Sequence, residues 1–120
     1  MTTGNEIPQR IKRALRELAG VANEREMARE LDKLASYFDA WRAGQAGVWE
    51  LKERIHQFHN GAARDLYNKY EESWADLLVA DAVKRGILRK DELPSEVWPY
   101  VQPRLAFLAS IQEPEQDEEG

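Results

Sequence analysis

The chain contains no cysteine among its 120 residues, so disulfide bonds, cysteine-ligated zinc and thiol nucleophiles are all excluded. No apolar run approaches the ~18 residues that a membrane helix needs. The first residues lack the basic and apolar regions of a signal peptide. From these absences we expect a cytoplasmic protein with no membrane partner.

Sequence motifs for catalysis are also scarce. The serines do not lie in a nucleophile-elbow context, and no glycine-rich phosphate loop is present. Carboxylates are plentiful, but their positions are typical of helix surfaces that face solvent. The sequence therefore gives little support to an enzyme.

Negative charge is concentrated at the end of the chain, where five acidic residues lie within residues 113–120. Without these five, 17 of the 22 acidic residues remain against 17 lysines and arginines, so the body of the chain is neutral. We expect one domain over residues 1–112 and a disordered acidic tail over 113–120. A neutral body argues against nucleic-acid binding, which usually requires a basic excess.

Helical periodicity dominates the body and predicts an all-α fold, a mostly antiparallel bundle of four to five helices. A first helix is expected over residues 7–22, with a break near Gly20. A second should begin at Asn23, where Glu26 would complete a capping box. Its apolar positions have the spacing of a helix seam: Met27, Leu31, Leu34, Phe38 and Trp41.

Residues 43–47 contain two glycines, which cost roughly 2 kcal/mol in a helix relative to alanine. This composition favours a tight loop between antiparallel helices. One long helix is the alternative, because five apolar positions keep a seven-residue spacing across the segment: Leu34, Trp41, Val48, Ile55 and Ala62. The sequence leaves both alternatives open.

A third helix is expected from Val48 to His59, ended by a left-handed cap at Asn60 and Gly61. A fourth should run from about residue 62 to 85 and end at Gly86. The inner face of this fourth helix would hold Leu66, Tyr70, Trp74 and Leu77. An ordered connection over 87–98 and a last helix that begins at Pro99 or Pro103 complete the predicted fold.

One cluster has the spacing of metal ligands, with Glu53, His56 and His59 three residues apart. Side chains at this spacing lie on adjacent ridges of a helix and can converge on one ion. Di-iron bundles use the same Glu-x-x-His spacing but need further carboxylates. A divalent metal is therefore the cofactor of an alternative hypothesis, and the main hypothesis has no cofactor.

A second candidate site lies at the expected junction between the third and fourth helices. Polar groups there would bind a small anion or a partner carboxylate: His59, Asn60, Arg64, Asp65 and Tyr67. Asp81 is a separate candidate, because it falls within the predicted inner face of the fourth helix. An ion pair with Lys84 or Arg85 would satisfy its carboxylate, and a contact with a ligand or subunit is the alternative.

The sequence favours a small non-enzymatic protein that acts by protein–protein interaction or regulation, with self-association and an unidentified protein partner. The apolar residues at 74–83 and the seam at 27–41 exceed what one small bundle can bury, which predicts a homodimer. The alternative is a helical-bundle metal-binding protein that uses Glu53, His56 and His59.

Overall fold

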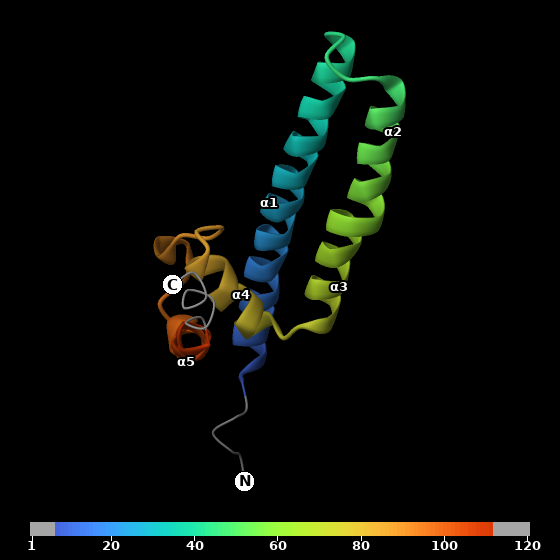
Figure 1. Cartoon of the computed structure of the whole chain (residues 1–120). Coiled ribbons are helices and arrows are strands. Elements are labelled where there is room, and N and C mark those ends of the chain that lie inside the picture. Colours follow the sequence, from blue (N-terminus) through green and yellow to red (C-terminus); the bar gives the residue numbers. More distant parts are fainter. Residues whose placement is uncertain (1–6, 112–120) are drawn as a thin grey trace, which may run out of the picture. The chain divides into compact units, whose positions relative to one another are not determined.

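The computed structural model describes residues 7–111, which fold into helices and the segments that join them (Figure 1). In chain order the helices are α1 (Gln9–Arg42), α2 (Val48–Gln57), the π-helix η1 (Phe58–Ala63), α3 (Arg64–Glu72), α4 (Ala75–Lys84), the 3-10 helix η2 (Lys90–Glu92) and α5 (Trp98–Ser110). No strand is present within 7–111, so the all-α prediction is confirmed. The predicted acidic tail, 113–120, lies outside the described residues.

Helix α1 continues through Gly20 and Asn23, so the predicted break between two helices is wrong. A glycine inside a helix costs about 1 kcal/mol, which the neighbouring helical hydrogen bonds and buried side chains outweigh. Ala22 lies between the two residues and is fully buried. Asn23 does not act as a cap because the chain before it never leaves the helix.

The turn after α1 is the predicted tight loop, and the alternative of one uninterrupted helix is wrong. Gly44 has a φ of +79°, a left-handed conformation that glycine adopts without steric cost. Its N–H donates to the carbonyl oxygen of Trp41 at 3.0 Å, and the N–H of Gln45 donates to that of Ala40 at 2.8 Å. This pair of bonds is a Schellman motif, which satisfies carbonyls left open at the helix end.

The expected left-handed cap at Asn60 and Gly61 is wrong, because the chain passes through both residues in the π-helix η1. Phe58 and the next apolar positions follow a repeated spacing of four: Phe58, Ala62, Leu66 and Tyr70. In an α-helix each such step drifts by about 40° around the axis. A π turn holds one more residue and removes this drift, so the 4-4-4 spacing was the available sequence signal.

The chain leaves the helix at Ser73 and Trp74 instead, so the fourth helix predicted over 62–85 is two helices. Trp74 has an extended backbone (φ −76°, ψ 144°), and 72% of its surface is exposed. Its predicted place in the core is therefore wrong, and Leu77 is half-buried. Because the break interrupts the helix, the phase of α3 does not carry into α4.

The described chain divides into two compact units. Unit 1 combines the part of α1 up to Ala22 with the residues from Ser73 onward, and unit 2 is Asn23–Glu72. Helix α1 contributes residues to both units. The single domain expected over residues 1–112 stays a prediction.

Unit 1 contains most of the buried apolar side chains. They come from the start of α1, from α4, from the connection after α4 and from α5: Ile11, Leu15, Leu78, Val79, Ala82, Ile87, Leu88, Val97 and Val101. Gly86 ends α4 as predicted, with a φ of +78°. Helix α5 begins at Trp98 with Pro99 in its first turn, and Pro103 lies inside it. Leu78, Val79, Ala80 and Ala82 of α4 are thus buried within one chain, and Leu77 and Val83 are half-buried.

Unit 2 is a helical hairpin in which α2, η1 and α3 return alongside the second half of α1 (Figure 1). Its helices are antiparallel, since Tyr37 contacts Arg54 near the turn and Glu26 contacts Lys69 far from it. Glu26 and Leu51 are its only buried residues among those described. None of the helices within residues 7–111 is both long and apolar enough to cross a membrane.

Candidate functional site

The residues of the predicted metal site lie on one stretch of the hairpin but do not form a ligand set. Glu53 and His56 are on α2, His59 is on η1, and all three are exposed. The Nδ2 atom of Asn60 lies 3.2 Å from Nδ1 and 3.0 Å from Nε2 of His56. Within residues 7–111 no three His, Cys, Asp or Glu side chains are placed to hold a metal ion. This geometry lends no support to the metal-binding alternative.

The residues of the predicted anion site are also exposed, and His59 precedes Asn60 on η1. Asn60 belongs to η1, while Arg64, Asp65 and Tyr67 belong to the first half of α3. The prediction relied on open backbone groups at a kinked junction. The chain instead passes from η1 directly into α3, and anion binding at this stretch stays a prediction.

Asp81 belongs to unit 1 and forms the local ion pair that the sequence predicted. Its Oδ2 atom accepts hydrogen bonds from Nη2 of Arg85 at 2.9 Å and from Nε at 3.0 Å. The two residues are one helical turn apart on α4 and its C-terminal end. This two-point contact pairs the carboxylate within α4, and a contact of Asp81 with a ligand or subunit stays a prediction.

The sequence analysis missed the role of Glu26, a carboxylate inside the hairpin that is only 7% exposed. Its Oε1 atom accepts hydrogen bonds from the Tyr70 hydroxyl at 2.8 Å and from Nζ of Lys69 at 3.3 Å. A buried carboxylate costs several kcal/mol unless it is paired and hydrogen-bonded, so these two donors keep it within the hairpin. The partners are more than 40 residues away, so the local pattern could not reveal them.

Asp76 in unit 1 is a second buried carboxylate that the sequence analysis missed. It is 7% exposed, and its Oδ2 atom accepts a hydrogen bond from Nε of Arg104 at 3.1 Å. Its Oδ1 atom accepts from the N–H of Leu77 at 2.8 Å. The contact joins α4 to α5 across 28 residues of sequence. An acidic residue near the start of a largely apolar helix was the available signal.

The two sides of the unit 2 hairpin differ in character. At about 100° per residue, Leu31 and Phe38 lie on one side of Leu34 in α1. Val48 and Ile55 lie on the same side of the hairpin in α2. We call these four residues, Leu31, Phe38, Val48 and Ile55, the apolar face. Leu31 is 47%, Val48 53% and Ile55 40% exposed, so the face remains largely open to solvent.

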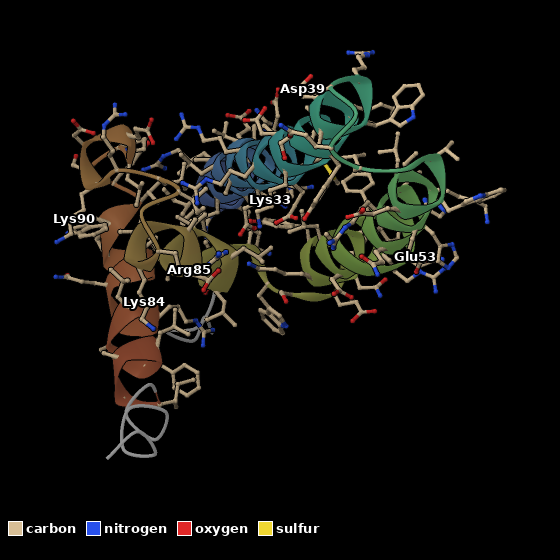
Figure 2. All side chains as sticks on the ribbon, turned by 45° about the horizontal axis from the view of Figure 1, so that its top comes forward. Lys33, Asp39, Glu53, Lys84, Arg85 and Lys90 are labelled. Carbon is tan, nitrogen blue, oxygen red and sulfur yellow. The ribbon has the colours of Figure 1, made fainter. Side chains whose placement is uncertain are left out.

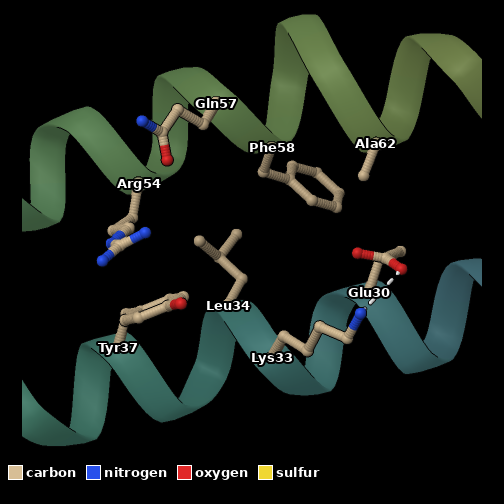
Figure 3. Close-up of a pocket in the computed structure, with 8 residues that line it drawn as sticks. All are labelled: Glu30, Lys33, Leu34, Tyr37, Arg54, Gln57, Phe58 and Ala62. Atoms are coloured by element: carbon tan, nitrogen blue, oxygen red, sulfur yellow. Dashed lines mark hydrogen bonds and ion pairs between the residues drawn. The ribbon is translucent and has the colours of Figure 1, made fainter. Parts of the chain in front are cut away.

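The opposite side of the hairpin has a groove of about 200 Å³ between α1 and the α2–η1 segment (Figure 3). Leu34, Phe58 and Ala62 supply apolar lining. The polar residues that line it are Glu30, Lys33, Tyr37, Arg54 and Gln57. Nζ of Lys33 lies 3.2 Å from a carboxylate oxygen of Glu30, three residues earlier on α1. At the other end, the Arg54 guanidinium lies 4.5 Å from the centre of the Tyr37 ring.

Comparison of the chain with protein-family models, curated proteins and solved structures finds no match. A functional conclusion therefore depends on the two sides of the hairpin and on the chemistry of their side chains.

Proposed function

We propose that the protein is a non-enzymatic self-association module, in which two copies pair through the apolar faces of their unit 2 hairpins. The exposure of this face carries the proposal. Leu31, Val48 and Ile55 each leave 40% or more of their surface open, although they occupy seam positions of their helices. Unit 1 buries most of the core side chains of the described residues, although Val21, Trp74, Phe107 and Ile111 are exposed there.

Burial of the apolar face would contribute a substantial free energy of association for so small a unit. Full burial of a leucine, isoleucine or valine side chain contributes about 1.5–3 kcal/mol relative to exposure. The hairpin obtains only part of this contribution, because two helices cannot enclose a core. A second hairpin packed on the apolar face would convert the pair into a four-helix arrangement with a closed interior.

A second copy of the chain fits this face because the face is complementary to itself under a two-fold rotation. An axis parallel to the helices places α1 of one copy against α2 of the other and keeps every residue at its level along the hairpin. Ala28 and Ala35 border the face on α1 and are exposed. Their small side chains allow a partner helix to approach closely.

Charges at the edges of the face match in the same arrangement. Tyr37 and Arg54 mark one level of the hairpin, because they stack across it. Asp39 lies two residues nearer the turn on α1 (Figure 2). Lys52 lies two residues nearer the turn on α2, and both residues are exposed. The two-fold rotation therefore places Asp39 of each copy at the level of the partner's Lys52. Opposite charges at an interface edge favour this pairing over others.

A charge-swap experiment tests both the surface and the partner. The mass of the full chain is measured by sedimentation over a range of concentrations for Asp39→Lys, Lys52→Asp and the double variant. Each single variant places like charges together and should weaken the dimer about fivefold to tenfold. The double variant restores opposite charges and should recover the original dissociation constant to within about twofold.

Two further variants distinguish the apolar face from general charge effects. Leu31→Glu introduces a charge into the face and should give a monomer that retains its helical circular dichroism spectrum. Glu53→Lys makes an equal change of charge on α2 away from the face and should leave the dimer unchanged. A mass that stays at 13.9 kDa at all concentrations would exclude self-association. A dimer that tolerates Leu31→Glu would exclude this face.

A further inference from the structure

The groove between α1 and the α2–η1 segment contains an arginine, Arg54, whose N–H groups are available to bind a ligand. Arg54 stacks on the Tyr37 ring at 4.5 Å, and its nearest carboxylate, that of Glu50, is 4.0 Å away. Within residues 7–111 neither the Arg54 guanidinium nor the Tyr37 hydroxyl has a hydrogen-bond partner. Stacking holds the planar guanidinium in one orientation, so its donors need little reorganisation to bind an anion.

The shape and lining of the groove select the kind of anion. A carboxylate matches the fork of a guanidinium and can accept two parallel hydrogen bonds from it. Toward the middle of the groove the lining is apolar, formed by Leu34 and Phe58, and Ala62 lies near Glu30 at the far end (Figure 3). The volume of about 200 Å³ is below that of sites for drug-sized molecules, so the ligand must be small.

The far end of the groove sets the charge of the ligand. Glu30 and Lys33 form an ion pair there at 3.2 Å, and this pair lies on α1 beyond Leu34 (Figure 3). The Glu30 carboxylate would repel a second negative charge, and its pairing with Lys33 reduces the attraction of that lysine for an anion. A ligand with one carboxylate and an uncharged body therefore suits the groove better than a dicarboxylate.

We infer that the groove binds small monocarboxylates with an apolar body, with the carboxylate on Arg54 and the body against Leu34 and Phe58. The Tyr37 hydroxyl is available as a further donor to the carboxylate. This site is separate from the proposed association, because the groove and the apolar face lie on opposite sides of the helix pair. Each of the two proposals can therefore fail without the other.

Calorimetric titration of the full chain with 3-phenylpropanoate tests the inference, with the alcohol 3-phenylpropanol as the uncharged comparison. We expect saturable binding of the carboxylate, and binding of the alcohol at least about tenfold weaker. Arg54→Gln should weaken carboxylate binding by about tenfold or more. Arg54→Lys keeps the charge but loses the planar fork, and should give an intermediate affinity. Tyr37→Phe keeps the stacked ring and should cost a few-fold in affinity.

Arg64→Gln is the matched control, because it removes the same charge from an exposed arginine of the same hairpin. It should leave the affinity for 3-phenylpropanoate within about twofold of the original value. No saturable binding up to about 20 mM, a concentration that corresponds to very weak affinity, would overturn the inference. Equal losses in Arg54→Gln and Arg64→Gln would also overturn it, since binding would then reflect net charge alone. Circular dichroism of each variant confirms that the hairpin is intact.

Discussion

At the scale of single residues, two buried carboxylates organise the interior of this small protein. Glu26 in unit 2 and Asp76 in unit 1 are each 7% exposed. Each accepts hydrogen bonds from at least two donors, one of which is a basic side chain. Buried charges contribute specificity only when their donors are present, because an unpaired carboxylate is costly in a low-dielectric interior.

Tyrosine substitutions test this dependence in unit 2. Tyr70→Phe removes the hydroxyl that donates to Glu26 at 2.8 Å and leaves the ring in place. We expect a loss of about 1–3 kcal/mol in the free energy of unfolding, because the buried carboxylate loses a donor. Urea denaturation measures the change. Tyr67→Phe is the control, since Tyr67 is 65% exposed and should change stability by less than about 0.5 kcal/mol. Equal effects of the two substitutions would contradict this role for Tyr70.

At the scale of helices and turns, some glycines end a helix and others lie inside one. Gly44 adopts a positive φ and ends α1, whereas Gly20 lies within α1 and is exposed. Gly61 also lies within a helical segment, in the π-helix η1. The residue type marks a place where a helix can end, and the surrounding chain decides whether it does.

Alanine substitutions at Gly20 and Gly44 should therefore change stability in opposite directions. A Cβ atom at Gly20 meets nothing within 4 Å, so Gly20→Ala should stabilise the protein by up to about 1 kcal/mol through helix propensity. Gly44→Ala forces a side chain into the left-handed region and should cost about 1–2 kcal/mol, although the space around it is open. Thermal melts of the two variants measure the difference, and shifts of the same sign would refute the assignment.

At the scale of the whole molecule, burial is distributed unequally between the two units. Unit 1 contains nearly all the buried apolar side chains of the described chain, and unit 2 contains only Leu51. Local stability follows the density of buried contacts, so the hairpin should open more readily than unit 1. The proposed association would compensate for this difference by covering the apolar face.

Hydrogen exchange at two protein concentrations tests this distribution. Amides of α4 and α5 should exchange slowly and at rates independent of concentration. Amides of α2 and α3 should exchange faster when the protein is dilute, and about tenfold more slowly at ten times the dissociation constant of the dimer. The Leu31→Glu variant supplies the control, because its hairpin should exchange rapidly at both concentrations. Exchange in unit 2 that is as slow as in unit 1 when dilute would contradict the prediction.

Local interactions explain what the sequence by itself determined. The all-helical class follows from apolar periodicity, and the ends of α1 and α4 follow from Gly44 and Gly86. Two ion pairs, Glu30 with Lys33 and Asp81 with Arg85, were also predictable, because residues three or four apart on a helix are neighbours. Each of these features depends on residues within one or two turns of each other.

Only the tertiary structure decided the rest. The continuity of α1 through Gly20, the π-helix at Gly61 and the exposure of Trp74 depend on which side chains other helices bury. The partners of Glu26 and Asp76 and the lining of the polar groove likewise come from distant segments. Local preferences of about 1 kcal/mol decide the outcome only where packing does not oppose them. Burial of several apolar side chains contributes more than such preferences, so long-range packing overrides the local signal.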